Sequence, residues 1–160
     1  MRQLTSEEIK SCQLQGYIFA ESIKLNCSSK IFVRRFMNSK ACERMDKQGL
    51  LFDSFMVEDI FNELEKEYGE FNYGSMKMSP EVMFWIGYIY RYWSISCEMK
   101  SKEIYSIQNC NEMIKLYLPY HTLDPMVAVE RIIEANNIDL EVDYLKKGVE
   151  ILRKIKNRNI

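Results

Sequence analysis

Proline and glycine are scarce in this sequence, which has three prolines and six glycines among 160 residues. Because both residue types interrupt regular structure, their scarcity leaves long segments free to form helices. Alternation of apolar and polar residues, which is typical of a half-buried strand, extends over no useful length. The longest apolar run is also far too short to cross a membrane, so we expect no membrane association.

Residues for metal or thiol chemistry are equally few. His121 is the only histidine, and no two of the five cysteines have a CxxC spacing. A zinc site needs clustered ligands, and an odd, scattered set of cysteines does not suit a disulfide framework. We therefore predict no metal, no cofactor and no disulfide, with reduced thiols that pack as small apolar side chains. The cysteines in question are Cys12, Cys27, Cys42, Cys97 and Cys110.

The scarcity of histidine and of clustered cysteines also argues against an enzyme. His121, Asp124 and Cys110 could be arranged as a base and a nucleophile. A single histidine three residues before a helix-capping aspartate is, however, more typical of a structural role. We assign no catalytic residues and predict a non-catalytic protein.

The overall composition indicates one globular domain over residues 1–160. Hydrophobic residues make up 47% of the chain and charged residues 28%, which permits a proper core and argues against disorder. The first ten residues, MRQLTSEEIK, carry acids where a secretory signal has its apolar stretch. A cytoplasmic location is the simplest expectation.

Helix start signals recur along the chain. TSEE at 5–8 has the form of a capping box, and a cap followed by proline occurs in SPE at 79–81 and DP at 124–125. We predict an all-α fold, a compact single-domain bundle of seven to nine helices. Their approximate ranges are 5–25, 29–38 (with a strand as the alternative), 40–46, 55–68, 80–97, 102–108 with Ser101 as its cap, one from Asn109 or Asn111 that Pro119 limits or kinks, 125–135 and 140–157.

The stretch WIGYIYRYW, residues 85–93, predicts the centre of the fold. Its helix would be apolar nearly all round, far beyond the stripe of a surface helix, so we expect other helices to pack about it. Gly87, Arg91 and Ser94 form a small polar seam on that helix. Arg91 cannot be left unpaired inside a protein. We expect it to reach an internal acid such as Glu112 or Asp124, or else to contact a partner.

Charge is segregated although the formal net charge is −1. Residues 53–70 hold seven acids against one lysine, whereas residues 146–158 hold six bases against one acid. A second basic block, residues 30–47, holds six bases against two acids. Such blocks either neutralise one another or face charged partners. In the last helix the apolar stripe is formed by Val142, Leu145, Val149, Leu152 and Ile155. We expect the first four of these to dock the helix while the bases face outward.

Four segments carry a family resemblance: FMNSKACERMD, WIGYIYRYW, SKEIY and YHTLDPMVAVERI. They resemble a family of small helical proteins from Gram-positive bacteria and their mobile elements. Members are often encoded beside predicted toxins with an ADP-ribosyltransferase-like domain and are regarded as antitoxins or accessory partners. The similarity covers about residues 28–46 and 79–134, a little over half the chain. It implies a protein partner and carries over no catalytic residue.

Two functional hypotheses follow. The first is an antitoxin-like protein that binds and neutralises or escorts a cognate bacterial toxin, the product of an adjacent gene. Its expected contacts are Trp85, Tyr88, Arg91, Tyr92, Tyr105, His121 and Asp124. The alternative is a nucleic-acid-binding regulatory module that uses the basic 30–47 and 146–158 surfaces. Its expected contacts are Arg34, Arg35, Lys146, Lys147, Arg153 and Lys154.

Overall fold

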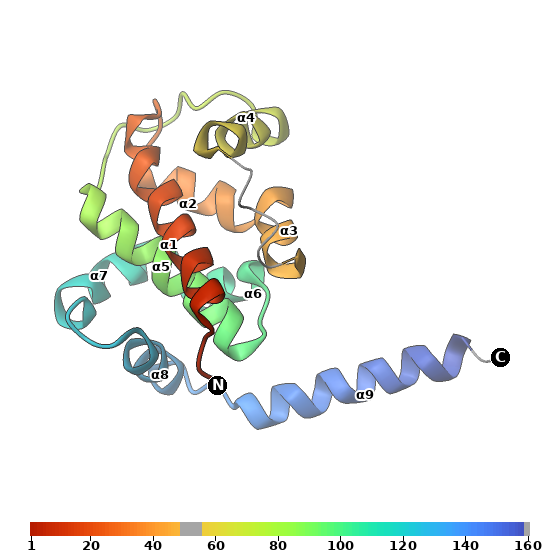
Figure 1. The fold of residues 1–160 in the computed structure, drawn as a ribbon. Coiled ribbons are helices and arrows are strands. Elements are labelled where there is room, and N and C mark those ends of the chain that lie inside the picture. The colour runs from red at the N-terminus through yellow and green to blue at the C-terminus, as the bar shows by residue number, and fades with distance from the viewer. Residues whose placement is uncertain (49–55, 159–160) are drawn as a thin grey trace.

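The computed structural model describes residues 1–48 and 56–158, and over these residues the chain is all-α, with no strand (Figure 1). This confirms the predicted fold class, the number of helices and the helical reading of residues 29–37. The elements are α1 (Ser6–Glu21), the short 3-10 helix η1 (Ser22–Lys24), α2 (Ser29–Met37), α3 (Lys40–Gln48), α4 (Val57–Tyr68), α5 (Pro80–Cys97), α6 (Ser101–Ile107), α7 (Cys110–Tyr120), α8 (Pro125–Ala135) and α9 (Leu140–Arg158).

Local capping chemistry explains where most of these helices begin. In the capping box of α1, Glu8 N–H donates to the Thr5 hydroxyl oxygen over 3.3 Å, and Thr5 N–H donates to the Glu8 carboxylate over 2.8 Å. Val82 N–H donates to the Ser79 hydroxyl oxygen at the start of α5, where Pro80 is the first helical residue.

Several boundaries differ from the prediction. Helix α3 continues to Gln48, and α6 includes Ser101, which was expected to cap it. The first α-helix ends at Glu21, and a 3-10 turn carries the chain on to Lys24. Pro119 does not stop α7, which begins after the Asn109 cap and continues through Tyr120. The predicted start of the fourth helix at residue 55 lies outside the described residues.

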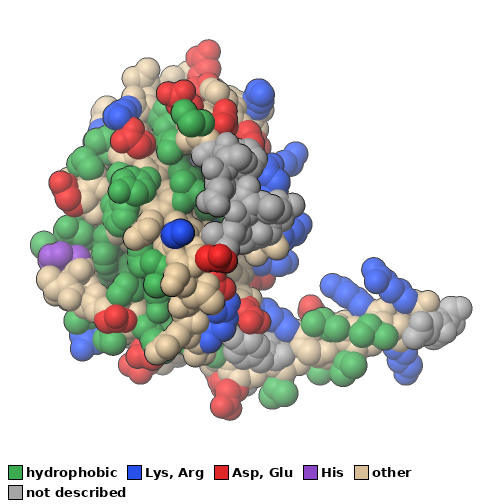
Figure 2. Space-filling view, in the orientation of Figure 1, with side chains coloured by type: hydrophobic (Ala, Val, Ile, Leu, Met, Phe, Trp, Pro, Cys, Tyr) green, Lys and Arg blue, Asp and Glu red, His purple; other side chains and the backbone are tan. Residues whose placement is uncertain are grey.

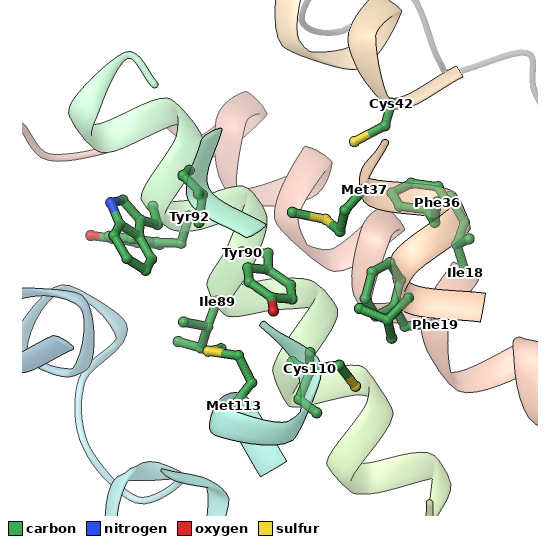
Figure 3. Packing of buried hydrophobic residues seen from close by; sticks show 14 of the residues in the cluster. Ile18, Phe19, Phe36, Met37, Cys42, Ile89, Tyr90, Tyr92, Cys110 and Met113 are labelled. Carbon is green, nitrogen blue, oxygen red and sulfur yellow. The ribbon is translucent and has the colours of Figure 1, made fainter. Parts of the chain in front are cut away.

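Helix α5 is the centre of the core, as its sequence predicts. Tyr90 and Trp93 are fully buried, and the Tyr90 hydroxyl donates to the Gln108 carbonyl oxygen over 2.7 Å. In Figure 3 the ring of Tyr90 lies between Phe19 of α1 and Met113 of α7. The aromatic centroids of Phe19 and Tyr90 are 6.5 Å apart. One helix therefore supplies the surface on which α1, α6, α7 and α8 pack.

Two glycines allow α1 to lie directly against α5. A Cβ placed on Gly87 would stand 2.7 Å from the carbonyl oxygen of Gln15 and 2.7 Å from the Phe19 ring. A Cβ on Gly16 would stand 2.8 Å from the ring of Phe84. Both distances are shorter than those that real Cβ atoms show in proteins. The absence of a side chain at these two positions therefore lets the two helices come this close.

Helix α9 projects from the body of the protein (Figure 1). Its apolar residues were predicted to dock, but the Leu145 side chain is 71% exposed and that of Leu152 is 67% exposed. Val149 and Ile155 are exposed as well, while the side chain of Val142 lies outside the described residues. The docking prediction is therefore wrong: periodicity identifies the apolar side of a helix but not what covers it.

We expect Gly87→Ala to lower the free energy of unfolding by about 1–3 kcal/mol, because the new methyl group meets backbone that cannot turn away. Gly16→Ala is the matched comparison. Its methyl group meets a half-buried Phe84 ring that can rotate, and the gain in helix propensity of about 1 kcal/mol offsets the crowding. Chemical denaturation of both variants tests this, and equal stabilities would contradict the close approach.

Candidate functional site

Arg91 forms a buried ion pair rather than a surface contact. The side chain of Arg91 is fully buried, and its Nη1 donates to Asp46 Oδ1 over 2.6 Å. Arg91 Nε donates to Gln15 Oε1 over 2.9 Å, and Nη2 lies 3.4 Å from Cys42 Sγ. The charge that the sequence singled out is therefore satisfied inside the protein.

The partners of Arg91 differ from those that the sequence suggested. Glu112 instead accepts a hydrogen bond from the Asn109 N–H, and Asp124 accepts one from the Met126 N–H, so both carboxylates cap helices. Asp46, the true counterion, also accepts from the backbone N–H of Ser101 over 2.8 Å and from its hydroxyl over 2.6 Å. One carboxylate thus connects α3, α5 and the first turn of α6.

A hollow of about 560 Å³ adjoins this ion pair. Its charged lining is balanced, with three basic and three acidic side chains, and four of the six are already paired as Arg2–Glu8 and Arg91–Asp46. The hydrogen bond from Arg2 is the main reason why the pKa of Glu8 falls to about 2. A balanced and internally paired lining offers no preference for an anion or a cation. We therefore interpret the Arg91–Asp46 ion pair as structural.

The candidate functional site is a row of aromatic rings along the outer side of α5. The rings of Phe84 and Tyr88 stack with centroids 6.1 Å apart, and those of Tyr88 and Tyr92 stack 6.4 Å apart. Tyr17 of α1 extends the row, with its ring edge-on to Phe84 at 5.4 Å and 60% of the residue exposed. Figure 2 shows hydrophobic side chains gathered over this side of the body.

A second set of rings forms the opposite wall. Trp85 meets Tyr117 of α7 edge-to-face at 5.8 Å, and Tyr117 stacks on His121 at 4.6 Å. Between the walls is an open, mainly apolar groove of about 320 Å³ with one carboxylate. We call this surface the aromatic face; it comprises Tyr17, Glu81, Phe84, Trp85, Tyr88, Tyr92, Tyr117 and His121.

Most of the predicted partner contacts belong to this face. Trp85, Tyr88 and His121 line the groove, whereas Tyr92 continues the stacked row beneath the surface, where it is buried. Asp124 lies close enough to help raise the pKa of Tyr92, although burial is the larger cause. Tyr105 does not belong to it, because its ring tilts against Tyr90 at 6.5 Å. Arg91 is too deeply buried to contact a partner.

Four members of the face were not predicted from the sequence. Phe84 precedes Tyr88 and Tyr92 at helical spacing, so the sequence held the signal for that row. Tyr17, Glu81 and Tyr117 join through the packing of α1 and α7 on α5, which no local pattern reveals.

The groups suited to nucleophilic chemistry are held in other roles. His121 Nδ1 lies 2.9 Å from the Tyr117 carbonyl oxygen and 3.1 Å from that of Leu118. Carbonyls only accept, so Nδ1 carries the proton. Burial raises the pKa of the Cys110 thiol to about 12, which keeps it protonated and unreactive near neutral pH. Among the described residues, no group of three or more His, Cys, Asp or Glu side chains could hold a metal ion.

Two bases of the block at residues 30–47 are engaged with other parts of the fold. Arg35 donates to the Gly69 carbonyl oxygen over 3.2 Å, and its guanidinium lies 5.4 Å from the Phe71 ring centroid. Arg44 pairs with Glu63 of α4. Arg34 is exposed, and so are Lys146, Arg153 and Lys154 on α9, whereas Lys147 is half-buried and its Nζ lies 3.4 Å from the Glu98 carbonyl oxygen.

Comparison with family models, curated proteins and solved structures finds no match to this chain. None of the described helices is long and apolar enough to cross a membrane. Function must therefore be argued from the aromatic face and the projecting helix.

We expect Arg91→Ala to lower the free energy of unfolding by about 3–5 kcal/mol, because it strands the Asp46 carboxylate in a mostly buried position. Arg34→Ala removes the same charge from an exposed site and should change stability by no more than about 0.5 kcal/mol. Thermal melting of the two variants decides the matter. An Arg91→Ala protein that melts like the parent but fails to bind a partner would mean that Arg91 is a binding residue.

Proposed function

We propose that the chain is a non-catalytic, antitoxin-like protein that binds and neutralises or escorts a toxin made from an adjacent gene. The observation that carries this proposal is the aromatic face. Its rings, apart from the buried Tyr92, are partly exposed, and they pack against one another around an open groove. The family resemblance of the sequence supplies the class of partner.

The composition of the face suits protein recognition. Tryptophan and tyrosine are enriched among residues that dominate binding energy, because they bury a large area while losing little conformational entropy. The Phe84–Tyr88–Tyr92 row is already ordered by stacking, so a partner need not organise it. The groove beside it is wide enough to receive one or two side chains of a partner.

Acidic groups at the face indicate the character of that partner. Glu81 lines the groove, and the charges of Asp124 and Glu130 act on the Tyr92 hydroxyl. A basic or apolar segment would complement this surface, whereas an acidic one would be repelled. We therefore expect the toxin to present a helix or loop with aliphatic and basic side chains.

Replacement of two exposed tyrosines by alanine, one at a time, tests the proposal. Tyr17 lies on the aromatic face, whereas Tyr73, which is 69% exposed, lies outside it. We expect Tyr17→Ala to weaken binding to the adjacent-gene product about tenfold or more. Tyr73→Ala should leave affinity unchanged. Calorimetry on purified proteins, with co-expression to measure rescue from toxicity, provides the readout. Equal affinities for both variants would count against the aromatic face.

Nucleic-acid binding remains the second candidate because α9 presents Lys146, Arg153 and Lys154 to solvent. The 30–47 block supports it less, since Arg35 and Arg44 are engaged within the fold. If α9 binds phosphate, the logarithm of affinity should fall with the logarithm of salt concentration, with a slope of about 0.9 per phosphate neutralised. Gel shifts with the promoter of the operon measure this slope. No shift at low salt would remove the candidate.

A further inference from the structure

Helix α9 carries an apolar side that the body does not cover. Its 19 residues span about 28 Å, and the apolar residues along that length are mostly exposed. Helices of this length draw most of their stability from packing rather than from intrinsic propensity. Figure 2 shows these hydrophobic side chains along the projecting arm. The exposed ones are Leu145, Val149, Ile151, Leu152 and Ile155.

Along one side of α9, two leucines are placed symmetrically about a glycine, and the two ends of that side carry opposite charges. Positions 141, 145, 148, 152 and 156 follow helical spacing and share one side. Leu145 and Leu152 flank Gly148, where an added Cβ would meet nothing within 4 Å. The line begins with the acid Glu141 and ends with the base Lys156. We call this line the α9 seam.

We propose that the α9 seam pairs with the α9 seam of a second copy of this chain, in antiparallel orientation about a two-fold axis. The axis passes between Gly148 and Val149, so that Leu145 packs on the partner's Leu152. Glu141 then faces the partner's Lys156, and symmetry makes this contact twice. Gly148 lies at the crossing point, where a residue without a side chain lets two helices approach closely.

The charges at the two ends of the seam select this arrangement. A parallel pair would place Glu141 against Glu141 and Lys156 against Lys156, which is repulsive at both ends. An acidic groove on another protein would complement Lys156 but repel Glu141. An anionic lipid surface would meet the same carboxylate on the apolar side of the helix. A second, antiparallel copy satisfies both ends together.

The pairing leaves the other surfaces free. The exposed bases Lys146, Arg153 and Lys154 lie off the seam and would face away from it. The aromatic face belongs to α1, α5 and α7, so an α9 pair would present two such faces. Dimerisation through α9 therefore stands independently of the proposed toxin binding, and either can fail without the other.

A charge exchange along the seam tests the pairing with the full-length protein. Light scattering coupled to gel filtration should give the parent twice its chain mass of 19.1 kDa. Glu141→Lys or Lys156→Glu alone turns both end contacts repulsive and should weaken dimerisation about tenfold or more. The double variant E141K/K156E restores attraction with the signs exchanged and should dimerise like the parent. Lys154→Glu makes the same charge change off the seam and should leave the mass unaltered.

Each outcome decides the proposal. A parent protein that stays monomeric at every concentration overturns it. So do single variants that dimerise like the parent, which would mean that the seam is not the interface. Failure of the double variant to recover would exclude the antiparallel register, whereas recovery with an unaffected Lys154→Glu control supports it. Circular dichroism of each variant confirms that the helical content of the body is retained.

Discussion

The need to neutralise one buried arginine determines how four helices meet. Arg91 lies on α5 with its side chain fully buried, so its charge needs a partner inside the protein. Its hydrogen bonds bring Asp46 of α3 and Gln15 of α1 to defined positions on that helix. Asp46 in turn accepts the free N–H at the start of α6, where the helix dipole favours a negative charge. Apolar contacts alone would tolerate sliding that this network does not.

The sequence revealed what depends on neighbours along the chain and failed where distant segments meet. The caps at Thr5 and Ser79 and the all-round apolar pattern of α5 are local, and the structure confirms them. Arg91 does pair with an internal acid, but Asp46 lies 45 residues away and nothing along the chain shows that the two meet, so the wrong acids were named. The docking prediction for α9 was wrong for a related reason. A pattern along the chain shows which side of a helix is apolar but not which other segment, if any, packs on it.

The aromatic face depends on the same close packing that builds the core. Phe84, Tyr88 and Tyr92 follow helical spacing and needed only α5. Tyr17 reaches them because its neighbour Gly16 admits the Phe84 ring and Gly87 admits the α1 backbone. A larger residue at Gly87 would push the α1 backbone away from α5, whereas one at Gly16 would turn the Phe84 ring out of the row. Gly87 therefore affects the stability of the body, and both glycines affect the shape of the candidate binding surface.

The two basic segments of the chain, residues 30–47 and the end of α9, have different surroundings. The basic block at residues 30–47 meets the acidic α4, as in the Arg44–Glu63 pair, and Arg35 is held by backbone carbonyls and aromatic rings. Within the part of the chain that the structure describes, the basic end of α9 meets no comparable acidic helix. Opposite charge nevertheless lies at the other end of the same helix, in Glu141. Each α9 carries an acid at one end of its apolar seam and a base at the other. Two copies packed antiparallel would therefore pair these charges between chains, much as bases of the 30–47 block pair with acids of the same chain.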